Sequence, residues 1–336
     1  MFLSKRNGIY YVWYVDDAGC KKKVSTRSGR MSEALSFLQT FKNGKAPQKY
    51  PRIALSEFQA QLLSYVRTNY AATTLPIYRR SLNHLATIAG DIPLSFLSPL
   101  HFHRYKTHRL KTVSPVMVNI ELRTLKAAMN TAARWRLLDR SPFERLSLAS
   151  VPEQIPLHFT REDFQKLVSV IKERWIKEVL IFAALTGMRQ GEILSLRWGQ
   201  VDLSRRTVTV QSNATFRTKH GKTRIVPLNN ALVTMLSAKQ PESADEFVFT
   251  HNNKPIYRNF LIRKLKRYVR MLGLDDRLHF HSLRHTFATW LVQDGVSLYE
   301  VQKLLGHSSI AVTQVYSHLQ PEQLHATVNR IVVSLN

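Results

Sequence analysis

Helical spacing of apolar residues in the middle of the chain constrains the fold more than any other feature of the sequence. After Ser114 the apolar residues recur at intervals of three and four: Val118, Leu122, Leu125, Met129 and Ala132. This spacing lines one face of an α-helix. Ser98-Pro99 and Ser114-Pro115 each place a capping hydroxyl before a proline, which is typical of a helix start. Residues 53–148 are therefore predicted to form roughly four helices.

Two proline-containing stretches separate this helical segment from its neighbours. Residues 43–52 carry a glycine, two prolines and three basic side chains, and Pro152 and Pro156 bracket the second stretch. Such composition is typical of linkers. We therefore expect three parts: residues 1–46, 53–150 and 155–336.

The first part resembles a small β-plus-helix unit. Residues 10–15 are rich in strand formers, residues 17–19 supply a turn, and a second strand is expected around Lys22–Thr26. A short amphipathic helix carrying Leu35, Leu38 and Phe41 on one face should follow.

The last part is predicted to be mixed. Residues 160–163 (Thr-Arg-Glu-Asp) resemble a capping box that opens its first helix. Helical patterns dominate, but Thr207–Gln211 and Thr223–Val226 alternate like strands on either side of a polar, basic turn. The expected fold class is mainly α with small β elements: a β-plus-helix unit, a helical domain and a mixed α/β domain.

The charge of the chain indicates a polyanionic partner. Its 49 Lys and Arg against 23 Asp and Glu give a net charge of +26, far more than solubility requires. No run approaches the ~18 apolar residues of a spanning helix, and the N-terminus lacks the features of a signal peptide. Cys20 is the only cysteine, which excludes disulfides within the chain and cysteine-based zinc sites. We expect a cytoplasmic protein that binds DNA or RNA; a generally basic protein, for instance a ribosome-associated one, fits the composition as well.

Five positions in the last part have residue types suited to phosphate chemistry. Arg189 emerges from a Thr-Gly break after an apolar helix, with Glu192 three residues on. Lys219 lies in the turn between the two predicted strands, with Lys222 as a near rival. Taken alone, an Arg beside a Glu is usually a surface ion pair, and a lysine in a hairpin tip is usually a solvated charge.

The third position is His281-Ser-Leu-Arg284-His285. Projected as a helix, His281, Arg284 and His285 share one side, opposite an apolar stripe. Two histidines four apart could instead bind a metal. Arg284 between them places a fixed positive charge where a cation would lie, so metal binding is the weaker interpretation.

The fourth and fifth positions follow a helix that Ser297 and Glu300 should cap. Gly306 can end that helix in a left-handed conformation, and His307 then projects beyond it. Tyr316 follows nine residues later. Singly, His307 could simply complement the helix dipole, and one tyrosine among 12 is unremarkable.

In this order the five positions resemble the catalytic set of tyrosine recombinases, the phage integrase family. The short sequences Thr-Gly-Met-Arg, His-Ser-Leu-Arg-His and Leu-Gly-His-Ser are similar to that family's motifs. The resemblance covers roughly residues 155–320. The resemblance implies catalytic roles for six residues: Arg189, Lys219, His281, Arg284, His307 and Tyr316, the last as nucleophile. It also implies that 53–150 is a core-binding domain and, more loosely, that 1–46 binds arm-type DNA sites.

The implied reaction is cleavage and rejoining of double-stranded DNA through a 3′-phosphotyrosine, with no cofactor and no metal. Four protomers would assemble on two DNA sites, with accessory DNA-bending or directionality proteins as possible partners and no membrane. The extra N-terminal unit favours an integrase of a mobile element or prophage over a housekeeping enzyme that resolves chromosome dimers. A type IB topoisomerase and a non-catalytic DNA-binding protein are the alternatives from other classes.

Overall fold

The computed structural model describes residues 1–15, 19–42, 50–143, 147–152, 155–212, 223–239 and 241–319. The chain divides into two compact units, Met1–Pro152 and Glu153–Asn336. Among the described residues, no helix combines the length and apolarity needed to cross a membrane.

A three-stranded antiparallel sheet opens the chain. Its strands, in the order β1-β2-β3, are β1 (Phe2–Arg6), β2 (Ile9–Val15) and β3 (Lys21–Ser25), and α1 (Met31–Lys42) packs against β1 and β2. The predicted strands and helix correspond to β2, β3 and α1. The first strand was not predicted, because Lys5 and Arg6 interrupt its apolar signal. Pairing with β2 fixes it, with Phe2 opposite Trp13 and the two rings stacked.

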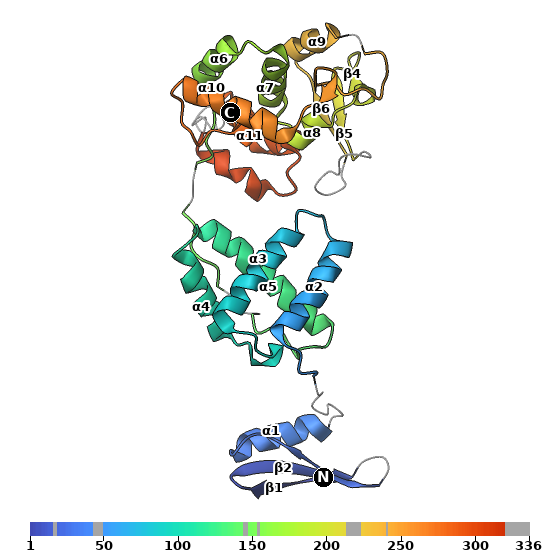
Figure 1. Cartoon of the computed structure of the whole chain (residues 1–336), viewed down its shortest axis with the longest axis vertical. Coiled ribbons are helices and arrows are strands. Elements are labelled where there is room, and N and C mark those ends of the chain that lie inside the picture. Colours follow the sequence, from blue (N-terminus) through green and yellow to red (C-terminus); the bar gives the residue numbers. More distant parts are fainter. Residues whose placement is uncertain are drawn as a thin grey trace, which may run out of the picture. The chain divides into compact units, whose positions relative to one another are not determined.

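Four α-helices follow, as the spacing of apolar residues predicted. They are α2 (Leu55–Asn69), α3 (Leu75–Ala89), α4 (Pro99–Leu110) and α5 (Pro115–Arg134), with a 3-10 turn η1 (Leu94–Phe96) between α3 and α4. The long helix α5 packs against α3 and α4 (Figure 1). The Ser114 hydroxyl accepts a hydrogen bond from the Met117 N–H at 3.4 Å, as expected of an N-cap.

The second unit is mainly helical with small sheets, and the chain as a whole has the predicted fold class. Its first helices are α6 (Arg161–Val170), α7 (Arg174–Thr186) and α8 (Gln190–Leu194), followed by the 3-10 turn η2 (Trp198–Gln200). Its strands are β4 (Val201–Asp202), β5 (Thr207–Val210), β6 (Arg224–Pro227), β7 (Thr250–His251) and β8 (Lys254–Pro255). The later helical elements are α9 (Asn230–Ser237), α10 (Arg258–Met271), α11 (Phe280–Gln293), α12 (Leu298–Leu305), η3 (Ile310–Val312) and η4 (Gln314–Leu319).

The two strands predicted around the basic turn are confirmed as β5 and β6. They pair antiparallel, with Thr207 opposite Pro227 and Val210 opposite Arg224. The turn itself, residues 213–222, lies outside the described residues, and Lys219 and Lys222 lie outside them with it.

Helix α11 lies at the centre of the second unit. It packs against α7, α12 and η4 (Figure 1). Local capping sets where the surrounding helices begin: the Thr160 hydroxyl accepts from the Asp163 N–H at 3.0 Å, and Ser297 and Glu300 form the predicted capping box of α12. Two of the motifs singled out in the sequence, Thr-Gly-Met-Arg and Leu-Gly-His-Ser, lie at the ends of helices that contact α11.

Candidate active site

The Thr-Gly-Met-Arg motif marks the point where α7 ends beside α11 and α12. Gly187 adopts the left-handed conformation (φ 61°) that closes α7. A Cβ atom at Gly187 would lie 2.4 Å from a ring carbon of Phe287 and 2.8 Å from a methyl carbon of Leu305. Glycine is therefore required for both the conformation and the close approach. Arg189 follows as the N-cap of α8.

One buried carboxylate orients two arginines. Glu192 accepts from the Arg189 backbone N–H at 2.8 Å and from Arg189 Nη1 at 2.9 Å. Arg224 of β6 binds the same carboxylate through two hydrogen bonds, at 3.0 and 2.6 Å. Burial raises the pKa of Glu192, but the hydrogen bonds and charges of Arg224 and Arg189 outweigh it and lower the pKa to about 2. Glu192 is thus ionised at neutral pH and fixes both guanidiniums.

Arg284 is bound by backbone carbonyls. It is 3% exposed, and its Nη1 and Nη2 donate to the Gly187 oxygen at 2.6 Å and the Leu305 oxygen at 2.7 Å. Burial, then the charge of Arg189, lowers its pKa to about 9, so it remains protonated at pH 7. These two bonds join the Thr-Gly-Met-Arg and Leu-Gly-His motifs, and they leave the charge of Arg284 without a directly bonded carboxylate among the described residues.

His307 lies directly after α12, as predicted. Gly306 ends the helix at φ 67°, and a Cβ atom there would lie 2.6 Å from Arg224 Cδ. His307 Nδ1 is 2.9 Å from the Thr313 hydroxyl. Burial, followed by the charges of Arg284 and Arg189, lowers the pKa of His307 to about 4. At neutral pH the ring is therefore uncharged and can exchange hydrogen bonds without adding positive charge.

Tyr316 lies in η4 with only 2% of its surface exposed. Burial raises its pKa to about 12, and the charge of Arg284 opposes the rise. The hydroxyl is 2.5 Å from Nδ1 of His285. The hydroxyl is thus protonated at pH 7 and already engaged by a histidine of α11.

The structure brings together five of the six residues indicated by sequence. The charge of Arg284 acts on Tyr316, His307 and His281, and Arg189 lowers the pKa of both histidines as well. His281 differs from the others because its side chain is exposed. The sixth residue, Lys219, lies outside the described residues.

Two residues of the site were not given a role from the sequence. Arg224 follows a basic turn and has no local signal that distinguishes it from its neighbours. His285 was noted within its motif but received no role, since its contact with Tyr316 spans 31 residues.

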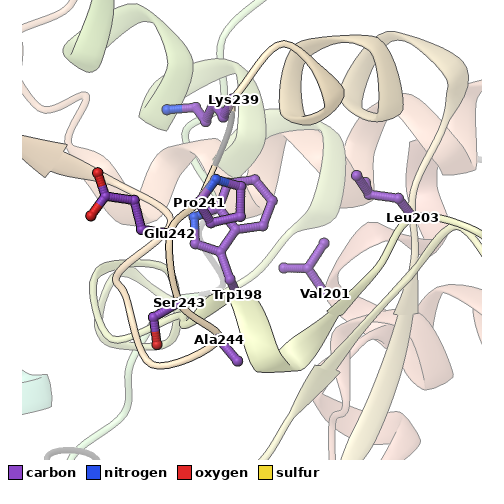
Figure 2. A pocket seen from close by; sticks show the side chains of 8 residues that line it. All are labelled: Trp198, Val201, Leu203, Lys239, Pro241, Glu242, Ser243 and Ala244. Carbon is purple, nitrogen blue, oxygen red and sulfur yellow. The ribbon is translucent and has the colours of Figure 1, made fainter.

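The catalytic candidates lie apart from the hollow drawn in Figure 2. That hollow, about 410 Å³, is lined by Trp198, Val201, Leu203, Lys239, Pro241, Glu242, Ser243 and Ala244. Nor does any cluster of three or more His, Cys, Asp or Glu suited to a metal ion occur in the described part of the chain. The arrangement of the site is that of a cationic surface suited to a phosphate, with the Tyr316 hydroxyl as its candidate nucleophile.

Known proteins resemble this chain in sequence. Residues 158–323 match the family model described as the phage integrase family. A tyrosine recombinase of Pseudothermotoga lettingae is 29% identical over 73% of this chain and 86% of its own length. Tyrosine recombinase XerA of Thermococcus kodakarensis is 29% identical over 82% of this chain and 93% of its own.

Solved structures show the same fold. The Tn1549 transposon integrase in complex with a circular intermediate DNA superposes with a TM-score of 0.67 at 20% identity, over 83% of this chain and 100% of that chain. A lambda integrase dimer bound to a COC′ core site gives 0.65 at 17% identity, over 99% and 97%. Sequence and fold together define a tyrosine-type site-specific DNA recombinase, which breaks and rejoins DNA strands. Residues 158–323 carry the domain of the phage integrase family.

Proposed function

We propose that this recombinase acts on double-stranded DNA in the cytoplasm through a covalent 3′-phosphotyrosine at Tyr316. The observation that carries the proposal is the convergence of Tyr316 with two fixed guanidiniums, Arg189 and Arg284. Arg284 has carbonyl partners and Arg189 shares its carboxylate, so the site holds surplus positive charge. A phosphodiester supplies the missing negative charge.

In the proposed reaction the Tyr316 oxygen attacks phosphorus as the 5′-oxygen leaves on the opposite side. Arg189 and Arg284 donate hydrogen bonds to the non-bridging oxygens, where charge builds in the transition state. His281 and His307 add hydrogen bonds, and Lys219 protonates the 5′-oxygen. The phosphotyrosine retains the energy of the broken bond, so we propose that rejoining uses no ATP, cofactor or metal.

The test is covalent capture on a nicked duplex that loses its 5′ fragment after cleavage. A pool of such duplexes with randomised cores is offered to the protein, and the adduct is isolated on a denaturing gel. We expect an adduct with wild-type protein and none with Tyr316→Phe. Tyr299→Phe, at an exposed position of α12, is the matched control and should form it normally. An adduct that survives Tyr316→Phe would contradict the proposal.

The assignment of Lys219 as general acid has its own test. We expect Lys219→Ala to cripple cleavage and Lys222→Ala to spare most of it. A 5′-phosphorothiolate substrate has a leaving group that needs no acid, so it should rescue Lys219→Ala. Rescue of Lys222→Ala alone would reverse the assignment.

We further propose the division of labour implied by the sequence: 1–46 contacts arm-type sites, 53–150 binds the core site and 155–336 carries the chemistry. A lambda integrase tetramer bound to a Holliday junction, similar in fold with a TM-score of 0.63, supports assembly of four protomers on two sites. Deleting residues 1–46 should abolish footprints at distal sites and spare the core footprint. We also propose that the residues after Gln320 dock on a neighbouring protomer, so truncation after Gln320 should weaken cooperative assembly while leaving single-site binding intact. Coincident footprints, or unchanged cooperativity, would contradict the respective role.

The proposed biological setting is a mobile element or prophage, with accessory bending or directionality proteins. The N-terminal sheet unit and the likeness to a transposon integrase support it. A chromosomal role is the second candidate, because relatives of this chain include tyrosine recombinases named XerA and XerC. Sequencing the DNA on either side of the gene decides between them, because attachment-site repeats would mark an integrated element.

A further inference from the structure

The hydroxyl of Tyr316 is bound by a histidine outside the proposed catalytic set. His285 Nδ1 lies 2.5 Å from the Tyr316 oxygen, which is at the short end of the range for hydrogen bonds. Tyr316 is 2% exposed, and His285 is the one hydrogen-bond partner of its hydroxyl among the residues that the structure describes. This hydrogen bond therefore orients the hydroxyl of the buried nucleophile.

The direction of this hydrogen bond follows from the charge states of its two partners. Burial raises the pKa of Tyr316 to about 12, so the phenol carries its proton at pH 7. Burial, then the charge of His281, lowers the pKa of His285 to about 4, so the imidazole is neutral. A proton on Nδ1 would leave the buried phenol proton without its acceptor, which costs free energy. The phenol therefore donates, and Nδ1 presents a lone pair.

We propose that His285 is the proton acceptor of the nucleophile in the strand-cleavage reaction proposed above, on which this inference rests. As the Tyr316 O–H bond breaks, its electron pair forms the bond to phosphorus and its proton moves to His285 Nδ1. The P–O5′ bond breaks, and the 5′-oxygen leaves with that pair and takes a proton from the general acid, Lys219 in our assignment. In rejoining, the 5′-hydroxyl returns its proton to the amine of Lys219 and attacks phosphorus, the P–O bond to Tyr316 breaks, and the departing Tyr316 oxygen recovers the proton from His285.

A weak base suffices for this step. Bonding to phosphorus makes the phenolic proton strongly acidic, so the proton passes to His285 as the bond forms. The groups that face His285 are His279, His281 and Arg284 at the start of α11, His307 after α12, and Tyr316 in η4. The charged neighbour in this set is cationic, so the imidazole stays unprotonated and ready to accept above about pH 5.

The two histidines and the arginine of the His-Ser-Leu-Arg-His motif thus point in three directions. His281 is exposed, Arg284 reaches the carbonyls of Gly187 and Leu305, and His285 reaches Tyr316. The rings of His281 and His285 meet edge to face with centroids 5.1 Å apart. His281 is consequently free to meet DNA while His285 serves the nucleophile.

The test compares His285→Ala with His285→Asn in single-turnover cleavage of the duplex captured by wild-type protein. Asparagine keeps a hydrogen-bond acceptor but cannot take a proton. We expect both variants to be slower by about 10²–10³-fold at pH 7, within the usual contribution of a general base. Added imidazole should restore His285→Ala and leave His285→Asn slow. Wild-type rates should be flat from about pH 6 to 9, whereas both variants should gain about tenfold per pH unit as hydroxide replaces the base.

Gel shifts should show unchanged DNA binding by both variants, and His318→Ala, an exposed histidine in η4, should cleave normally. If His285→Asn cleaves at nearly the wild-type rate, His285 acts only as a hydrogen-bond acceptor and not as a base. If His285→Ala cleaves faster than wild type, His285 slows the reaction. Either result overturns the inference.

A measurement without DNA separates this inference from the proposed function. Failure of wild-type protein to form any adduct would contradict the proposed function. In ¹⁵N NMR spectra of the imidazole rings, His285 Nδ1 should be unprotonated in the wild type, and its signal should shift in Tyr316→Phe. A protonated Nδ1 would overturn the inference even if the recombinase is active.

Discussion

Each compact unit buries an arginine against a glutamate, and the two clusters differ in their charge balance. In the helical part, Arg109 binds Glu121 through two hydrogen bonds of 2.8 Å, and the Tyr105 hydroxyl adds a third at 2.9 Å. One cation meets one anion, and both side chains are less than one tenth exposed. The cluster is closed and its hydrogen bonds are mutually satisfied.

The cluster in the second unit has surplus positive charge. Glu192 serves both Arg189 and Arg224, and Arg284 nearby is bound to carbonyls. The site thus holds three guanidiniums and one carboxylate, which binds two of them directly. Burying unpaired charge is costly, and a fold that retains it gains a ready site for an anion. The comparison teaches that the balanced pair is structural and that the surplus marks the place where we propose that a phosphate binds.

The largest expected effect comes from breaking the balanced cluster. Arg109→Ala leaves Glu121 buried and unpaired, so we expect a loss of about 3–5 kcal/mol in the free energy of unfolding. Urea denaturation measures it. Removing both charges, in Arg109→Met with Glu121→Leu, should recover most of the stability. If the double variant is as unstable as the single one, the cluster is not a simple charge pair.

Replacing a guanidinium in the surplus cluster should act on chemistry. In Arg284→Lys the charge remains, but an ammonium cannot bind both carbonyls and a phosphate in the same geometry. Cleavage of the captured duplex should slow by about 10²–10³-fold, or roughly 3–4 kcal/mol. The urea midpoint serves as the control. If Arg284→Lys cleaves at the wild-type rate, only the positive charge matters at this position.

Acid should act on the surplus cluster through Glu192. Its folded pKa of about 2 lies below the ordinary value of 4.5, so the unfolded chain binds the proton first. The resulting stability, of order 3 kcal/mol, is present above pH 4.5 and is lost as the pH falls toward 2. Unfolding free energies of wild type and Glu192→Gln should converge over this window. If the unfolding free energies of the two proteins stay the same distance apart over this pH range, the lowered pKa of Glu192 is contradicted.

The smallest effects compare two helix caps. Ser114→Ala and Ser297→Ala should each cost about 1 kcal/mol in unfolding free energy. Only α12, which Ser297 caps, ends at the carbonyl of Leu305 that binds Arg284. Ser297→Ala should therefore also slow cleavage by less than about tenfold, whereas Ser114→Ala should leave the chemical step unchanged. Equal effects on cleavage would argue against this coupling.

Local features of the site could be read from the sequence because short-range chemistry fixes them. Gly187 and Gly306 end helices, and Arg189 and His307 follow them directly, as the motifs predicted. The capping box at Ser297 and the strands flanking the basic turn are equally local. In each case a few neighbouring residues decide the backbone conformation.

Contacts between distant segments could not be read in this way. Arg284 meets Gly187 across 97 residues, and Arg224 meets Glu192 across 32. The charge balance of the site depends on these pairings, the first between α11 and the end of α7, the second between β6 and α8. For the same reason β1 was missed: its pairing with β2 outweighs a weak local pattern.

The most direct test of the account is to map the covalent adduct on the protein. Trypsin should release Tyr316 in the peptide 304–330, in which it is the one tyrosine, while Tyr299 falls in 285–303. After nuclease digestion of the captured complex, mass spectrometry should find the nucleotide on peptide 304–330, joined through a 3′-phosphate. A nucleotide on any other peptide, or a 5′-phosphate linkage, would contradict the account.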